Sequence, residues 1–386
     1  MSDFATTGLV VGVYTSFRNG LAYLDSYVEH VDAYTHTLAT EGWYQDASIT
    51  IKGDLDFVED WYANGLGRHI VVRDEAGATV FEGFVNSVRI SVGALTAVRG
   101  PLMDVVNRAH MVYSVVDTTT APPTVGQRER TQTFGYNDSS SKYGLLYRIL
   151  SAGGIAAANV SQTLTTYLLE SKEPLTNETL TFGNEGSAPT VTLEVEGYVS
   201  WLATFPYVAT SSGTITVRNK LLAVLAASLN STLFSTDYSQ VGTNGTLVQA
   251  YDNDDRTALA VVKSLVAIGD SLGTRYYYGF GDERRFLYND ISATFAYRHR
   301  LADNSQRIED LNGGTVQPWA VKPAKWILIS DFLSGAIVPS DIAQDPRALF
   351  AETVTYTAPY GLTINGGRVA TLPQKLARLG LSGIGA

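Results

Sequence analysis

The stretch DNDDRTALAVVKSLVAIGDSLGTRYYYGFGDERRFLY, residues 252–288, decides the fold of its part of the chain and bears most directly on function. Its first half has apolar residues at helical spacing and Gly269 as a stop signal, with Asp254 or Asp255 as the expected N-cap. Its second half has aromatic residues at alternate positions on both sides of Gly281–Glu283, which predicts two strands joined by a tight turn. The predicted order is therefore a helix followed by a hairpin.

The same stretch contains an apparent enzyme motif, Gly269-x-Ser271-x-Gly273, which matches the nucleophile elbow of serine esterases. A nucleophile elbow needs a strand before the serine and a helix after it, and here the predicted order is reversed. The only histidine that follows Ser271 in the chain is His299, and no Asp-x-x-His pattern occurs. We therefore interpret the glycines as turn residues at a helix exit and expect no catalytic residue.

Residue types that bind metals are present without the spacing that a metal site requires. The chain has five histidines, and none pair at metal-ligand spacing on one helix: His30, His36, His69, His110 and His299. Asp252, Asp254 and Asp255 lack the glycine and the distal glutamate of a calcium loop, so helix capping explains them better. Cysteine is absent, which excludes disulfides and thiolate sites. We expect no metal and no cofactor.

Two glycine pairs and one charged cluster have structural interpretations as well. Gly65-x-Gly67 and Gly279-x-Gly281 each lack the third glycine of a dinucleotide-binding loop, and neither follows a strand and opens a helix. Glu283, Arg284 and Arg285 fall at the predicted hairpin turn. We expect them to form a solvated tip or a subunit contact rather than an active site.

The composition favours a protein of strands and contact surfaces. Of 386 residues, 45% are hydrophobic and only 17% are charged, while Gly (35) and Tyr (22) are plentiful. The 28 basic and 38 acidic residues give a net charge of −10 without any basic block, which argues against phosphate binding. Asp3 and the lack of a basic start make a poor signal peptide, and no apolar run approaches the ~18 residues of a membrane span. We expect a soluble chain made in a cytoplasm.

Periodicity and capping signals predict short strands interleaved with short helices, an α+β fold that is mostly β. Strands are expected at 49–51, 69–73, 79–92, 95–99, 111–116, 191–195, 215–217, 276–280, 286–288, 326–329 and 353–357. Helices are expected from Asp54 to Asn64-Gly65, from Gly100-Pro101, from Ser139–Ser141 to Gly153, and at 198–205, 220–229, 259–268 and 372–379. Residues 117–130, with two adjacent prolines and no periodicity, read as a linker, and 382–386 as a frayed tail.

A series of sites along the chain resembles the baseplate hub, or tail hub, proteins of tailed bacteriophages. The sites are Phe81-Glu82-Gly83, Gly100–Asp104 with Arg108, VTLEVEGYVSW at 191–201, residues 255–288, VQPW at 316–319, DFL at 331–333 and VTYTAP at 354–359. Their order and spacing carry the resemblance, and residues 1–40 contribute nothing to it.

The resemblance implies two β-barrel-like domains joined by α/β or helical parts. The implied division is a first β-barrel domain with an N-terminal extension at 1–116, a linker at 117–130, a middle α/β domain at 131–235, and a second β-barrel-like domain with a C-terminal helix and tail at 236–386. Three copies of such a hub close into a ring that joins a hexameric tail tube to a threefold tip or baseplate.

The function implied is structural, in a virion that is assembled in the host cytoplasm. Expected partners are two further copies, a tail tube or distal tail protein, and tail fibre or tip proteins, with genomic DNA passing through the ring without specific binding. The net negative charge favours an acidic lumen that repels phosphates. No catalytic residue and no lysozyme or peptidase segment is expected.

Two other classes of function remain open from the sequence. A receptor-binding or carbohydrate-binding tail-tip protein would use Tyr276 and Tyr278 as stacking platforms, whereas we favour cross-strand packing inside a barrel for this aromatic hairpin. A serine esterase acting through Ser271 is the other alternative.

Overall fold

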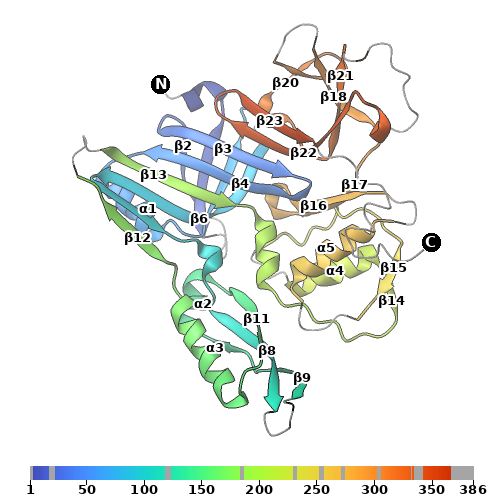
Figure 1. Ribbon diagram of the computed structural model, residues 1–386. Helices are drawn as coiled ribbons and strands as arrows, with labels where there is room; N and C mark the ends of the chain where they lie inside the picture. Colours follow the sequence, from blue (N-terminus) through green and yellow to red (C-terminus); the bar gives the residue numbers. More distant parts are fainter. Residues whose placement is uncertain are drawn as a thin grey trace.

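The computed structural model describes most of the chain. The described residues are 3–16, 22–117, 122, 124–182, 187–228, 233–251, 256–270, 274–301, 306–331, 333 and 342–366. Strands dominate them and short helices are inserted between the strands, so the fold is α+β and mostly β, as predicted (Figure 1). No helix in these ranges is both long and apolar enough to cross a membrane.

The central element of the fold is one continuous antiparallel sheet of eight strands. Their order is β23–β22–β3–β4–β13–β6–β7–β12. Their bounds are β23 Gly361–Gly366, β22 Ala348–Thr357, β3 Val31–Ala39, β4 Glu41–Lys52, β13 Ser187–Glu196, β6 Thr79–Gly93, β7 Leu95–Arg99 and β12 Thr176–Leu180. The long strand at β6 and its return in β7 are confirmed.

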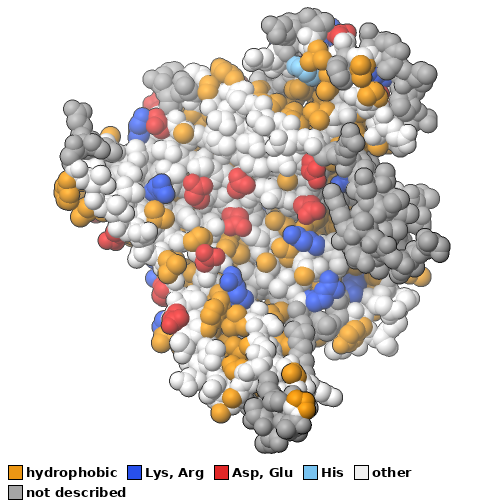
Figure 2. Space-filling model, viewed as in Figure 1, with side chains coloured by type: hydrophobic (Ala, Val, Ile, Leu, Met, Phe, Trp, Pro, Cys, Tyr) orange, Lys and Arg blue, Asp and Glu red, His pale blue; other side chains and the backbone are white. Residues whose placement is uncertain are grey.

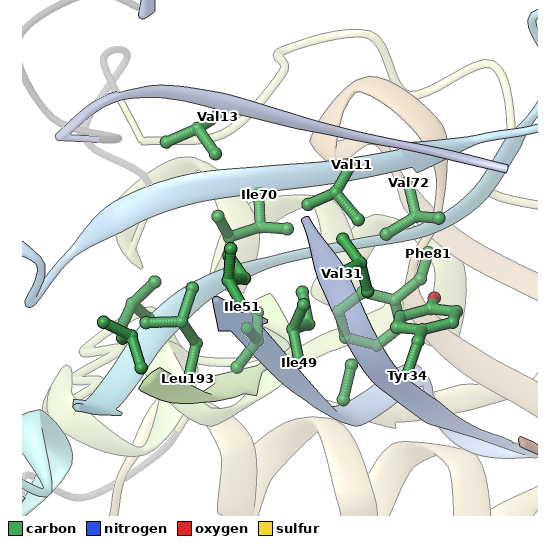
Figure 3. Close-up of a cluster of buried hydrophobic side chains, with 14 of the residues drawn as sticks. Val11, Val13, Val31, Tyr34, Ile49, Ile51, Ile70, Val72, Phe81 and Leu193 are labelled. Carbon is green, nitrogen blue, oxygen red and sulfur yellow. The ribbon is translucent and has the colours of Figure 1, made fainter. Parts of the chain in front are cut away.

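The first core lies inside a barrel-like curl of this sheet. From β6 the pairing continues through β5 (Arg68–Arg73) and β1 (Val10–Ser16) to β2 (Tyr23–Tyr27), and β2 leads through a short turn into β3. Figure 3 shows side chains from these strands pointing toward one another, among them Val11, Ile49, Ile70, Val72 and Leu193. The 3-10 turn η1 (Asp3–Thr7) adds Phe4 to this core.

Helix α1 (Leu55–Asn64) packs on the first core as its periodicity predicts. The Asp54 side chain accepts a hydrogen bond from the N–H of Phe57 at 2.9 Å, and Val58 and Trp61 are buried. The helix ends at Asn64-Gly65 as expected, but Gly65 has φ −72° rather than the left-handed conformation that glycine often adopts at a helix end, and its N–H donates to the carbonyl of Trp61.

A second core joins the chain after β13 to the stretch at 252–288. It is formed by η3 (Tyr198–Thr204), α4 (Val217–Ser228), α5 (Ala258–Ile268), β16 (Tyr276–Phe280) and β17 (Phe286–Asp290). β14 (Thr214–Thr216) and β15 (Leu247–Gln249) pair beside it, so Val217 begins α4 rather than ending a strand. The residue that caps α5 is Thr257, which corrects the expected cap at Asp254 or Asp255, two residues outside the described ranges.

A third core belongs to a small α/β unit inserted between β7 and β12. Its sheet contains β8 (Arg108–Asp117), β9 (Thr124–Arg130), β10 (Phe134–Gly135) and β11 (Tyr147–Gly153), with α2 (Asn137–Tyr143) and α3 (Ala157–Ser171). The α3 helix was not predicted. The predicted helix at Gly100-Pro101 is only the 3-10 turn η2 (Leu102–Asp104), although Leu102, Val105 and Val106 in and after this turn are buried.

Two further predictions in this unit are wrong. Residues 124–130, predicted as part of a linker, form β9 and pair with β8. The helix predicted to end at Gly153 is short, because α2 stops at Tyr143 and β11 follows, parallel to β8. Leu146 and Leu150 satisfy helical spacing, but burial against a neighbouring strand decides the outcome.

The fourth core lies in a β unit at the other end of the continuous sheet. β18 (Phe295–Arg300), β19 (Ile308–Asp310), β20 (Thr315–Val316) and β21 (Lys325–Ser330) join β22 and β23 around Val321, Ile327 and Val354. The short turns η5 (Pro318–Ala320) and η6 (Ile342–Gln344) connect them. The predicted helix at 372–379 and the tail at 382–386 lie outside the described residues.

Strand pairing interleaves the predicted domains. β13 comes from the range assigned to the middle domain, yet it lies between β6 and β4 of the first unit. The division of the chain into domains at residues 116, 130 and 235 stays a prediction. Pairing across its limits holds the two β units together through the β3–β22 ladder (Figure 1).

Candidate functional site

The aromatic hairpin inside 252–288 is part of the second core. Tyr278 lies opposite Tyr288, and Phe280 lies opposite Phe286. All four side chains are buried, and the Tyr276 ring stacks on Tyr288 with centroids 4.6 Å apart. Cross-strand packing is therefore confirmed, although the rings pack with helices of the second core rather than inside a barrel. Tyr278 is not an exposed stacking platform for sugars.

The turn of this hairpin, η4 (Asp282–Arg284), has an unusual backbone that faces the first unit. Glu283 and Arg284 have φ of 58° and 57°, a left-handed conformation that residues other than glycine seldom adopt. Hydrogen bonding from the backbone of both residues acts to lower the pKa of Glu82 on β6, and the N–H of Arg284 also donates to the carbonyl of Gly281 at 3.1 Å. The turn thereby ties the second core to the sheet, which corrects the expectation of a purely solvated tip, although the Glu283 side chain itself is exposed.

Glu82 is a buried carboxyl, 3% exposed, on a strand segment covered on both faces. His69 of β5 lies beside it, with Nε2 3.4 Å from Oε1 of Glu82, and Nδ1 of His69 contacts the hydroxyl of Tyr198. Burial raises the pKa of Glu82 to about 7, while the nearby Arg284 charge and the two N–H donors act to lower it. Burial lowers the pKa of His69 to about 3, so its ring is neutral near pH 7.

A cavity of about 250 Å³ adjoins this junction. The hydroxyl of Tyr44 donates to Oδ1 of Asp282 at 2.5 Å, and Lys322, which follows Val321 of the fourth core, also lines the cavity. Burial lowers the pKa of Lys322, and Asp282 and Asp74 partly oppose this. Residues beside the first, second and fourth cores therefore meet at this cavity, and we assign it a structural role.

The apparent esterase motif begins at a helix exit, as the sequence predicts. Gly269 ends α5 with φ 67°, and Oδ1 of Asp270 accepts a hydrogen bond from the N–H of Thr274 at 2.8 Å. A helix thus precedes the motif and β16 follows it, the reverse of a nucleophile elbow. Ser271 and Gly273 lie outside the described residues.

The remaining candidate residues are separate from one another. His36 is buried in β3 among aromatic rings, His110 contacts the hydroxyl of Tyr147 in the α/β unit, and Nδ1 of His299 lies 3.0 Å from the carbonyl oxygen of Arg307. Within the described ranges no three His, Asp or Glu side chains are grouped so as to hold a metal ion.

The glycine pairs serve backbone packing. A Cβ on Gly279, which has φ 157°, would lie 2.0 Å from the carbonyl carbon of Gly42, so β16 approaches β4 more closely than any side chain allows. Gly67 has φ 78° in the turn before β5. Neither pair adjoins a dinucleotide-binding arrangement.

The outer face of the continuous sheet is a second candidate, because it is hydroxyl-rich and acidic. Asp46 lies opposite Glu196, and Glu194 accepts a hydrogen bond from the Ser48 hydroxyl at 3.1 Å. Acidic side chains gather over β13, β4 and β6 (Figure 2). Partial burial raises the pKa of Asp46 and of Glu196, and the Asp46 charge adds to the second shift. In the described part of the chain, none of these three carboxylates forms an ion pair.

The sequence analysis identified neither the buried junction at Glu82 nor the acidic sheet face, although the sequence contains a signal for each. A charged residue inside the apolar run VFEGFV marks Glu82 as a buried carboxyl that needs a partner. Alternation in VTLEVE at 191–196 places Glu194 and Glu196 on one face of a strand. The partners of these residues come from distant parts of the chain, and no local pattern identifies them.

No protein-family model matches the chain, and no curated protein matches it. Among solved structures it is similar to the tail protein from Neisseria meningitidis MC58, at 8% sequence identity over 92% of this chain and 94% of that chain, with a TM-score of 0.40. It is also similar to the 43 kDa tail protein of prophage MuSo2 from Shewanella oneidensis, at 9% identity over 93% of this chain and 96% of that one, with a TM-score of 0.40. A likeness at this level carries no inference about function.

Proposed function

We propose that this chain is a structural subunit of a bacteriophage tail, and that three copies form a hub ring between the tail tube and a threefold tip or baseplate. The series of sites between Phe81 and Pro359 that resembles tail hub proteins supports the proposal. One structural observation carries it: β3 and β22 pair over five residue pairs, so the two β units of a copy are fixed in one sheet.

The fixed pair of β units suits symmetry matching. Each copy presents two β units, so three copies offer six units to a sixfold tube while keeping threefold symmetry toward the tip. This requires that the two units stay in constant relative position. The β3–β22 ladder, from Thr353 opposite Ala39 to Thr357 opposite Thr35, supplies that rigidity.

The acidic sheet face has a role in the same proposal. On this face Asp46, Glu194 and Glu196 outnumber the nearest cation, Arg89 of β6, which lies opposite Thr192, so the face repels DNA phosphates. Lining the channel with this face lets genomic DNA pass without binding. Neutralising these carboxylates should then slow DNA passage without changing ring assembly.

The partners of such a ring are a tail tube or distal tail protein on one side and tail fibre or tip proteins on the other. The work is done by shape and contacts, with no catalytic step and no cofactor. The chain then resides in the virion after assembly in the host cytoplasm.

The test combines the mass of the purified chain with its place in a particle. Light scattering should give three times the mass of 41.7 kDa, and particles purified through a tag on this chain should contain tail tube protein. A chain that purifies without any virion protein contradicts the proposal.

A further inference from the structure

Within the part of the chain that the structure describes, no strand pairs with the outer edge of either terminal strand of the continuous sheet. Among the described residues β12 pairs only with β7, and β23 pairs only with β22. All strands between them are antiparallel, so one sheet runs across the molecule from β12 to β23 (Figure 1). An unpaired edge presents a row of backbone N–H and C=O groups that a further strand can satisfy.

Apart from its short length and Glu178, the β12 edge has few of the features that protect natural edge strands. Its sequence, TNETL, contains no lysine and no proline, and its five residue pairs with β7 show no bulge. All five residues are exposed. Apolar side chains flank the edge, with Leu175 67%, Leu180 61% and Phe182 80% exposed. An orange group at the left extremity of the molecule marks this end of the sheet (Figure 2).

A groove of about 550 Å³ runs along β23 at the opposite end. Its apolar lining comes from β19, β21, β22 and β23: Ile308, Ile327, Ile329, Leu349, Leu362 and Ile364. One end of the molecule thus carries projecting apolar side chains beside a free edge, and the other carries an apolar groove beside a free edge. The two ends are complementary in shape and chemistry.

The charges favour this pairing over the pairing of two β12 strands. The only charged residue in β12 is Glu178, and β23 has none. Two antiparallel β12 strands would bring the Glu178 side chains of both copies close together, which is unfavourable. A β12–β23 pair brings no like charges together.

We propose that β12 of one copy adds to the free edge of β23 in a second copy, with Leu180 and Phe182 entering the groove along β23. The contact is head-to-tail, so each copy uses both ends and the sheet continues from copy to copy until the ring closes. Closure into a ring rests on the proposed function, whereas the contact itself does not. The sheet face with Asp46, Glu194 and Glu196 then forms a continuous wall.

The absence of cysteine allows a direct test by cross-linking. Thr179→Cys on β12 and Thr363→Cys on β23 are combined in the full chain, which is treated with a short bis-maleimide reagent and run on denaturing gels. We expect linked species larger than one copy from the double variant only. A head-to-tail contact leaves each single variant monomeric on the gel.

Two controls make the outcome specific. Thr179→Cys combined with Val125→Cys, an exposed residue on the edge strand β9, should give no linked species. Leu180→Lys with Phe182→Lys should raise the concentration of half-assembly by about tenfold or more, because two apolar anchors are lost, while Val125→Lys leaves it unchanged. Both changes are at exposed positions, so thermal unfolding should stay as in the wild type.

Several results would overturn the inference. Linked dimers from Thr179→Cys alone would show pairing of two β12 strands instead. An oligomeric chain whose double variant stays unlinked, or a wild-type chain that is monomeric at the highest attainable concentration, contradicts the contact. Absence of tail proteins from tagged particles counts against the proposed function only, since the cross-link is measured on the purified chain.

Discussion

Replacing Glu82 by glutamine should remove a large part of the pH dependence of stability. Burial raises the pKa of Glu82 to about 7 from 4.5. A carboxyl with a raised folded pKa binds its proton more tightly in the folded state, so the free energy of unfolding falls as pH rises from 4.5 to about 7. A shift of about 2.5 units at about 1.4 kcal/mol per unit corresponds to about 3 kcal/mol.

The groups that face Glu82 do not titrate in the same window. His69 has a pKa lowered to about 3, which lies below this range, and Tyr198 has a pKa raised well above 10. The charges of Arg284 and Asp282 act on Glu82 in opposite directions, and Arg284 has the larger effect. Glu82 is therefore the group at this junction whose protonation differs between the folded and the unfolded chain from pH 4.5 to about 7.

Urea unfolding at pH 5 and pH 8, followed by tryptophan fluorescence, measures the effect. The wild type should lose about 3 kcal/mol more than Glu82→Gln between the two pH values. The glutamine keeps an oxygen that accepts from the N–H groups of Glu283 and Arg284, so the turn stays in place. Glu59→Gln, at an exposed site on α1, should behave as the wild type. Parallel pH profiles for wild type and Glu82→Gln would refute the assignment.

Three further changes test the packing and capping described above. Gly279→Ala should destabilise the fold by about 3 kcal/mol or more, because its Cβ meets the backbone of Gly42, whereas Gly245→Ala has open space and should be neutral in the same urea series. Thr257→Ala should cost about 1 kcal/mol and speed hydrogen exchange in the first turn of α5 alone; uniform exchange would contradict the cap. Tyr44→Phe should cost about 1.5 kcal/mol through loss of the bond to Asp282, against no change for the exposed Tyr360→Phe; equal effects would argue against that bond.

Elements whose signal is local could be predicted from the sequence. Alternation at Val88, Ile90 and Val92 marks a strand that has one face on the core, and it is found as β6. Asp54 marks the start of α1 because its side chain can satisfy a free N–H group, and it does. The aromatic hairpin follows for the same reason, since both strands and their turn lie within one short stretch.

Elements whose conformation depends on distant partners could not be predicted. Residues 147–153 form a strand because they pair in parallel with β8. Each residue's partner in β8 lies more than thirty positions earlier in the chain. The residues 124–130 lack alternation and are a strand only through pairing with β8. The left-handed turn at Glu283 and Arg284 carries no glycine, and it is held by Glu82 from the first unit.

The proposed hub function requires that copies of this chain close into a ring through their sheets. Electron microscopy of the purified chain tests this directly. We expect class averages of a threefold ring with an open centre, lined by the sheet face that carries Asp46, Glu194 and Glu196. Single particles of one copy, or a ring with a basic channel, would contradict it.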